Sequence, residues 1–448
     1  MREQEDAIQV GPLLDHGRFV GLPLLVAVFT TLTFVFDGFD IQAIAFAAPK
    51  LLSEWGIDRA ALAPVLAAGL IGMAIGASCL GALGDYYGRK RALIASLLLV
   101  AVGCWLSAHA GNLDQLAIYR MVTGLGLGGC LPNAAALIVE FAPLHVRNVV
   151  MSITVVGVPI GGLLGAWLAG ALIPAFGWRS IFIVGAILPA ILAIAMLFWL
   201  SESARFLAVK PERWPQLARL LNRLTRSNRY RPEGPYQISE KASGKVGVAA
   251  LFTAEFSHDT VLVWLIFFTN VFAVYALFGW LPVVLSSAGL PLSTALHGSL
   301  AFNLGGVVSS IIASSLLNRA GSRLVLITLG IIAIASTFAA MQLNLSPSSV
   351  GLLLTVLCAA GLGINGLQVI MYSVASHIYP TPCRSSGLGW ALGIARIGGI
   401  LSSYGGSVLL AHGGSATFFG GLACTLVITL LGILMLRGHM PRTKSAPP

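Results

Sequence analysis

The chain has 448 residues, of which 57% are hydrophobic and only 10% are charged. Soluble domains carry about 25% charged residues, so this composition excludes a soluble protein and indicates one that crosses a membrane several times. The formal net charge of +10 is compatible with nucleic-acid binding, but the placement of the basic residues along the chain favours another explanation.

Twelve apolar segments follow one another, each about as long as the 20 residues that a helix needs to span a bilayer. The first 18 residues are polar and the first apolar segment is long enough to remain a helix, so no cleavable signal peptide is expected. We predict an all-α polytopic membrane protein with spans near residues 19–48, 60–83, 91–110, 113–140, 148–173, 179–200, 258–285, 293–317, 324–343, 349–377, 386–411 and 416–437.

Basic residues gather on one side of these spans. If the N-terminus is cytoplasmic, the N-terminal tail, the loops after even-numbered spans and the C-terminal tail hold 22 of the 27 Lys and Arg residues. The opposite loops hold only Lys50, Arg59 and Arg179. Cytoplasmic loops of membrane proteins are enriched in Lys and Arg, so both termini are predicted to be cytoplasmic. This asymmetry explains the net charge without a nucleic-acid partner.

Two carboxylates lie inside the first span. Asp37-Gly38-Phe39-Asp40 places them three residues apart, so on a helix they share a face. One Asp at mid-bilayer costs roughly 2.5–3.5 kcal/mol on insertion scales, and such residues are usually functional. Burial and mutual repulsion disfavour two negative charges here. We therefore predict that Asp37 and Asp40 handle protons, and which of the two carries the proton stays open.

Residues 201–257 form the one long polar stretch and contain ten Lys or Arg residues. This stretch is predicted to be a cytoplasmic linker between two units of six spans, 1–200 and 258–448. Leucines recur in it at helical spacing, at positions 217, 220, 221 and 224. Part of the linker is therefore expected to lie on the membrane surface.

An internal repeat supports this division. Gly124-Leu-Gly-Leu-Gly-Gly129 in the fourth span matches Gly361-Leu-Gly-Ile-Asn-Gly366 in the tenth, at an offset of 237 residues. At the same offset, Pro143-x-x-x-Arg147 matches Pro380-x-x-x-Arg384. Six-helix repeats in parallel are typical of transporters in which two bundles rock about a central site.

Two arginines lie within spans. Arg396 is about eleven residues into the eleventh span, roughly 16 Å deep at 1.5 Å per residue, and no Asp or Glu follows residue 259. Its counter-charge must come from the other half or from an anionic ligand, and a guanidinium matches a carboxylate. We predict that Arg396 binds a substrate carboxylate. Arg120 lies at a depth comparable to that of Asp37 and Asp40, so a pair between them is expected.

Amide and aromatic side chains of the second half are predicted to line a central cavity. Apolar walls with a few convergent polar groups suit an aromatic acid. No nucleophile–base pair, phosphate loop or metal-ligand spacing stands out, so neither an enzyme nor a bound cofactor or metal is expected. The substrate-binding candidates are Asn270, Tyr275, Asn303, Asn365, Gln368 and Tyr372.

Several motifs resemble those of a known family. The loop Gly81-Ala-Leu-Gly-Asp-Tyr-Tyr-Gly-Arg-Lys-Arg91 resembles the cytoplasmic signature between helices 2 and 3 of the major facilitator superfamily, and Arg120-x-x-x-Gly-x-Gly-x-Gly128 resembles its fourth-helix signature. Asp37-Gly-Phe-Asp40 and Glu202-Ser-x-Arg-Phe-Leu207 resemble motifs of the aromatic acid:proton symporters within that superfamily. Ser201 departs from that pattern, in which Pro is usual.

The resemblance implies the major facilitator fold, with twelve transmembrane helices in two six-helix bundles. It also implies a gate at the cytoplasmic loops. The gating candidates are Asp85, Arg89, Lys90, Glu140, Arg147 and Arg384.

The sequence thus predicts an importer of a small aromatic carboxylate, coupled to protons and working by alternating access as a monomer in the lipid bilayer of a bacterial inner membrane. Asp37, Asp40 and Arg120 are assigned to proton coupling and Arg396 to the substrate. Two alternatives stay open. One is a major-facilitator carrier for a sugar or a non-aromatic organic acid, and the other is a non-transporting sensor of aromatic acids.

Overall fold

Long helices make up most of the computed structural model, which describes residues 8–225, 227–237, 251–252, 256–343, 345–379 and 383–441. Eleven helices in this part of the chain are long and apolar enough to cross a membrane. The predicted all-α polytopic fold is confirmed. These helices are α2 (Leu22–Trp55), α3 (Ala63–Tyr87), α4 (Arg89–Ala108), α5 (Leu113–Phe141), α6 (Leu144–Phe176), α7 (Arg179–Trp199), α10 (Ser257–Ser287), α11 (Leu292–Ala320), α12 (Ser322–Gln342), α13 (Val350–Ile378) and α14 (Arg384–Met435).

The last helix, α14, contains two of the twelve predicted spans. Its 52 residues are far more than one crossing of a bilayer requires. The backbone leaves the helical region at Gly413 and Gly414, and Gly414 has a φ of 63°, which favours glycine. Beyond this point the helix returns along itself, since a side chain at Gly421 would touch Leu409. Spans eleven and twelve are therefore both present.

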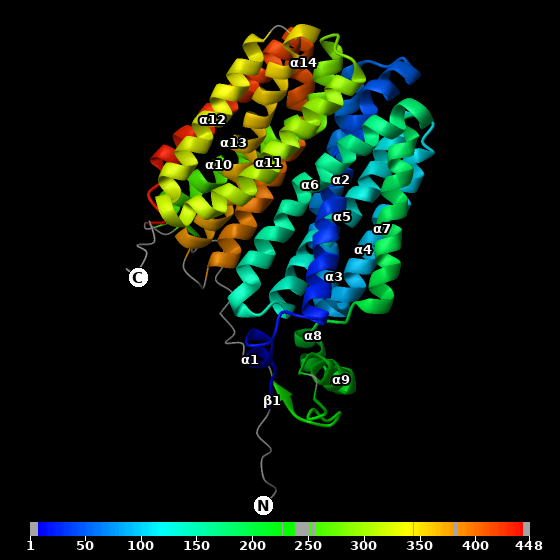
Figure 1. Ribbon diagram of the computed structural model, residues 1–448, viewed down its shortest axis with the longest axis vertical. Coiled ribbons are helices and arrows are strands. Elements are labelled where there is room, and N and C mark those ends of the chain that lie inside the picture. Colours follow the sequence, from blue (N-terminus) through cyan, green and yellow to red (C-terminus); the bar gives the residue numbers. More distant parts are fainter. Residues whose placement is uncertain are drawn as a thin grey trace, which may run out of the picture.

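Short elements gather at one end of the molecule, called the linker end below (Figure 1). They are α1 (Val10–Asp15), α8 (Ala204–Val209), α9 (Trp214–Thr225), the 3-10 turn Pro211–Arg213 and the strands β1 (Ile8–Gln9) and β2 (Tyr236–Gln237). The two strands pair in parallel, with Ile8 opposite Tyr236. The beginning of the chain is thus fastened to the linker. Two further 3-10 turns, Arg59–Leu62 and Pro347–Ser349, precede α3 and α13.

Part of the linker was expected to lie on the membrane surface, but the structure places its leucines inside the protein. Leu217, Leu220 and Leu221 of α9 are buried in a hydrophobic cluster with residues of α1, α7 and α8. The spacing of the leucines indicated an amphipathic helix, and α9 is one. Its apolar face packs on the protein, and its basic face points away from that cluster.

The helices fall into two sets, α2–α7 and α10–α14, which lie side by side in Figure 1. The repeated glycines make equivalent contacts in each set. Gly124 of α5 meets the backbone of α3 at Gly69, and Gly361 of α13 meets the backbone of α11 at Phe302. Such close helix crossings need a residue without a side chain. The two sets are therefore built on the same packing scheme.

The two sets close on each other at the end away from the linker, called the far end. One hydrophobic cluster contains residues of both sets, and all its members from the first set lie in the far halves of their helices, such as Phe46 and Leu51 of α2. The cluster nearest the linker contains residues 10–236 only. Among the described residues, hydrophobic contact between the sets is thus concentrated at the far end.

Candidate functional site

A buried ion pair joins α2 to α5. Arg120 donates from Nη1 to Oδ1 of Asp40 at 3.0 Å and from Nη2 to Oδ2 at 2.8 Å. Nη2 also donates to the Asp40 backbone carbonyl at 3.0 Å, and the Cys104 thiol donates to Oδ1 at 2.9 Å. The Arg120 and Asp40 side chains are 4% and 2% exposed. Asp40 and Arg120 thus form a two-pronged, charge-assisted pair of hydrogen bonds.

Asp37, one turn earlier on α2, is in a different environment. It is 2% exposed, and its Oδ1 accepts no hydrogen bond from any described residue. The charges that act on it are those of Asp40, which repels, and Arg396, which attracts. The two acids of the motif are thus unequal, since one has a fixed partner and the other has only a more distant one.

Arg396 lies on α14, in the opposite set of helices, and is partly exposed. Within the described part of the chain it forms no ion pair and no hydrogen bond. Its charge acts on Asp37 and on the phenols of Tyr275 and Tyr372. These four side chains, from both sets of helices, therefore form a group close enough for their charges to interact.

Polar side chains of α10 and α13 stand beside this group. Asn270 donates from Nδ2 to Oε1 of Gln368 at 2.8 Å, which orients the Gln368 amide near Tyr372. The Tyr372 ring packs edge-on against Phe267, with centroids 5.5 Å apart. Asn365, one turn before Gln368, donates to the Gly361 carbonyl at 3.1 Å. This set offers both amides and aromatic walls.

Asn303 is engaged elsewhere, in a pair that sequence reasoning missed. Its amide and that of Gln42 on α2 exchange two hydrogen bonds, of 2.8 and 3.1 Å, across the contact between the two sets. Both side chains are buried, and Gly162 of α6 leaves room for them. The sequence feature that could have indicated this pair is Gln42 itself, a single amide in an otherwise apolar stretch of the first span. The pair fastens α2 to α11.

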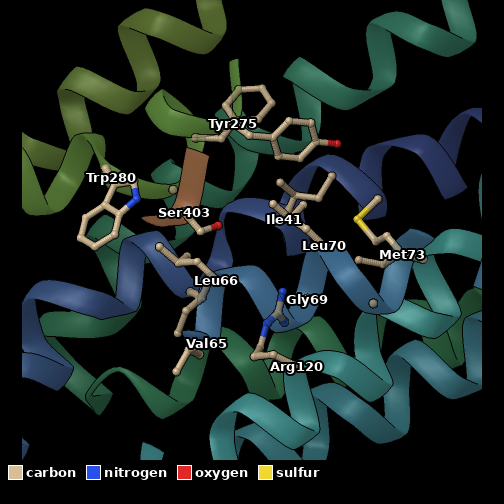
Figure 2. A pocket seen from close by; sticks show the side chains of 15 residues that line it. Ile41, Val65, Leu66, Gly69, Leu70, Met73, Arg120, Tyr275, Trp280 and Ser403 are labelled. Carbon is tan, nitrogen blue, oxygen red and sulfur yellow. The ribbon is translucent and has the colours of Figure 1, made fainter. Parts of the chain in front are cut away.

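A small cavity lies between α2, α3, α5, α10 and α14, beside Arg120. Arg120 reaches it from one side, and Tyr275 and Trp280 from the other, with Ser403 between them (Figure 2). Its volume is about 30 Å³. That is room for a water molecule, whereas a cavity known to bind benzene has about 150 Å³. Its lining comes from both sets of helices.

The gating candidates pair within the first set or with its attached segments. Arg89 contacts Asp85, and its Nε lies 4.0 Å from Oε1 of Glu140. Arg147 bonds Asp15 of α1 at 2.6 Å. These residues make no ion pair with the second set among the described residues, in line with the contacts concentrated at the far end. Arg384 begins α14, but its side chain lies outside the described residues.

The turn before α4 shows how these loops are built. Gly88 has a φ of 108°, and a side chain there would collide with Glu202. The Glu202 carboxylate accepts from the backbone N–H of Lys90 at 2.9 Å and of Ser203 at 3.0 Å. It thus caps the positive end of α4 and ties the linker to it.

The sequence pattern of the Major Facilitator Superfamily matches residues 30–402 of the chain. The chain belongs to the major facilitator superfamily. It is 34% identical over 420 residues to the 4-hydroxybenzoate transporter PcaK of Pseudomonas putida, covering 90% of this chain and 91% of that protein. It is 34% identical to the gallate transporter of Pseudomonas putida, over 95% and 92% of the two chains.

The fold agrees with this assignment. A solved inward-open structure of the xylose transporter XylE from E. coli superposes with a TM-score of 0.71, at 16% identity, over 93% of this chain and 97% of that one. The predicted superfamily is confirmed, and these relatives are transporters and not enzymes. The protein is a multi-pass membrane protein of the major facilitator superfamily.

Proposed function

We propose that this major-facilitator protein imports a small aromatic carboxylate together with protons. The observation that carries the proposal is the pairing pattern of its buried charges. Arg396 has no ion pair among the described residues, in the part of the chain that lacks acids, and its charge acts on Asp37 of the other set of helices. A carboxylate ligand supplies the anion that Arg396 lacks.

Coupling follows from competition for Arg396. While Asp37 is charged, it attracts the guanidinium that the substrate needs. A proton on Asp37 removes that competitor, so the anion binds better, and a bound anion in turn makes the proton easier to hold. Such effects are reciprocal by thermodynamic necessity. Proton and anion therefore bind together.

Asp40 has a structural part in this scheme. Its two-pronged bond to Arg120 joins α2 to α5. Releasing a buried pair of this kind is expensive, because each charge would be left without compensation. We assign the transported proton to Asp37 and the anchoring of α2 to Asp40 and Arg120.

The relatives and the chemistry of the site support ring-hydroxylated benzoates as the substrate class. The relatives quoted above are named for 4-hydroxybenzoate and gallate, both of which carry ring hydroxyls and a carboxylate. Beside Arg396, Tyr372 and Phe267 offer aromatic walls, and Gln368 and Asn270 offer amides for hydroxyl groups.

Alternating access is proposed to move the units 1–200 and 258–448 against each other, joined by residues 201–257. The contacts at the far end describe one state, open toward the linker end. If that end is cytoplasmic, as the basic residues indicate, this is the state that releases substrate into a bacterial cell. The predicted gate residues Asp85, Arg89, Lys90, Glu140, Arg147 and Arg384 would join the units in the opposite state.

Counterflow in proteoliposomes tests this function. Vesicles preloaded with unlabelled compound are expected to take up labelled 4-hydroxybenzoate when they contain 4-hydroxybenzoate or gallate. They are expected not to do so with 4-hydroxybenzyl alcohol, which keeps the ring and hydroxyl but lacks the carboxylate. Counterflow driven by xylose or succinate would contradict the substrate class. Binding of 4-hydroxybenzoate without counterflow would indicate a sensor and contradict transport.

A further inference from the structure

A second, larger cavity lies at the linker end, away from the charges between the two sets of helices. It has a volume of about 600 Å³ and is bounded by the start of α4, the end of α7 and the outward face of α9. Five of its lining side chains are basic: Lys90, Arg91, Arg213, Arg219 and Arg223. Apart from Lys90, which is a gating candidate, these basic residues have no part in the proposed transport mechanism or gate.

The cavity lacks the negative charge to balance these residues. Its one acid, Glu202, already accepts the backbone N–H groups of Lys90 and Ser203. None of the five basic side chains forms an ion pair with a carboxylate in the part of the chain that the structure describes. Arg91 and Arg223 are exposed. The cavity therefore suits an anion from outside the chain.

The lining toward the spans is apolar. Leu98 of α4 and Leu197 of α7 are 45% and 56% exposed, and the Leu197 carbonyl accepts from Nζ of Lys90 at 2.9 Å, so the apolar and basic parts of the lining adjoin. Two residues after Leu197, Trp199 is 59% exposed at the end of α7, as is common for Trp at the boundary between membrane and water. The cavity thus joins a basic region to a hydrocarbon-facing surface.

The position of α9 explains why its arginines face this way. Its leucines are buried against the protein, so Arg219 and Arg223 lie on the opposite face, toward α4 and α7. A helix that covered the bilayer with its apolar face would have turned these arginines to water instead. In this structure they line the same cavity as the start of α4 and the end of α7.

We propose that this cavity binds the headgroup of an anionic phospholipid, whose acyl chains lie along Leu98 and Leu197. Basic pockets between the ends of spans recognise such headgroups. A soluble phosphate would use the arginines but not the adjoining apolar surface. The lipid connects the linker to the first set of helices at the membrane boundary.

The test uses the full-length protein in nanodiscs of phosphatidylethanolamine with phosphatidylglycerol, and measures by mass spectrometry the lipid that stays bound after transfer to detergent. One variant combines Arg91→Gln, Arg219→Gln and Arg223→Gln. A matched control combines Arg18→Gln, Arg229→Gln and Arg231→Gln, which removes the same charge from exposed residues at the same end but outside the cavity.

The cavity variant is expected to retain phosphatidylglycerol about 100-fold more weakly than the wild type, because each basic residue near an anionic headgroup contributes roughly fivefold. The control is expected to match the wild type, and the zwitterionic phosphatidylethanolamine is expected not to be retained selectively by any of the three proteins. Equal loss in both variants would show a diffuse charge effect and overturn the site. Displacement of the lipid by millimolar glycerol 3-phosphate would overturn the choice of a lipid. Thermal unfolding of each variant checks that both are folded.

Discussion

The two acids of the first span share a face of one helix and yet have different partners. Helical spacing predicts that Asp37 and Asp40 both face inward, and similar depth predicts a pair with Arg120. Spacing alone does not choose between them, because residues three apart differ by less than a turn. The choice depends on how α5 approaches α2, where Arg120 meets both the carboxylate and the backbone carbonyl of Asp40.

Replacing each acid by its amide separates the two roles. Asp37→Asn is expected to abolish uphill accumulation driven by a pH gradient and to leave counterflow intact, since the neutral side chain mimics the protonated state. Asp40→Asn leaves Arg120 buried without its partner, which costs about 3–5 kcal/mol, so lower thermal stability and yield are expected. Accumulation and unfolding temperature are measured, with the exposed Asp114→Asn as control. Normal accumulation by Asp37→Asn would move the proton site elsewhere.

Arg396→Lys tests the carboxylate ligand. Lysine keeps the positive charge beside Asp37 but cannot make two parallel bonds to a carboxylate. Loss of one charge-assisted hydrogen bond of about 1.5–3 kcal/mol corresponds to a dissociation constant for 4-hydroxybenzoate raised roughly 10- to 100-fold. Calorimetry measures the affinity, with Arg323→Lys, an exposed site, as control. Unchanged affinity would remove Arg396 from the site.

At the scale of helices, the contact between the sets depends on a polar pair in an apolar surface. Gln42 and Asn303 satisfy each other, so the bonds between them must break whenever α2 and α11 separate. The two sets of helices must separate at the far end if the protein is to open toward the side opposite the linker. The pair is thus expected to stabilise the state described here relative to its opposite.

Leucine substitutions at this pair test that expectation. Gln42→Leu or Asn303→Leu alone leaves the other buried amide with backbone partners on its own helix but none across the sets, at about 1–3 kcal/mol, and the double variant is expected to recover part of the loss. The readout is the labelling rate of a cysteine placed at Leu66, which a side chain at Gly279 of the other set would touch. Single variants should label faster.

The matched control is a hydroxyl pair inside one set. Thr269 and Thr429 are 2.8 Å apart and join α10 to α14, so their replacement by valine should leave labelling at residue 66 unchanged. Equal acceleration by the valine and leucine variants would indicate general loosening and would count against a specific role for the amide pair.

The repeat gives a prediction about helix packing. Gly124→Ala and Gly361→Ala each push a methyl group into the backbone of a neighbouring helix, so both are expected to destabilise the protein by about 1–3 kcal/mol. Gly351→Ala, with open space around it, is the control. Unfolding temperatures in detergent measure the difference. Tolerance of alanine at one of the two glycines alone would show that the repeat does not extend to packing.

At the scale of the molecule, the sequence predicted the spans well because hydropathy measures what the bilayer requires of each segment. The position of the linker could not be predicted from the sequence. The leucines of α9 have the same helical spacing whether they face lipid or protein. The Gln42–Asn303 pair could not be predicted either, since one amide in a span does not identify its partner 261 residues away. Tertiary contacts decide both.

The division of labour between Asp37 and Asp40 predicts how the whole carrier responds to its driving forces. With Asp40 fixed on Arg120, one proton accompanies one monovalent anion, and the cycle moves no net charge. Accumulation is then expected to reach about tenfold per pH unit. A membrane potential alone should drive none.

Proteoliposomes measure this directly, with the pH gradient and a potassium–valinomycin potential imposed separately. Protein-free liposomes correct for the protonated acid that crosses lipid unaided. A second coupled proton would leave one net charge to move, and 100 mV would then contribute about 2.3 kcal/mol, or roughly 50-fold accumulation, without any pH gradient. Uptake driven by the potential alone would therefore mean that Asp40 also releases Arg120 during transport, and that both acids carry protons.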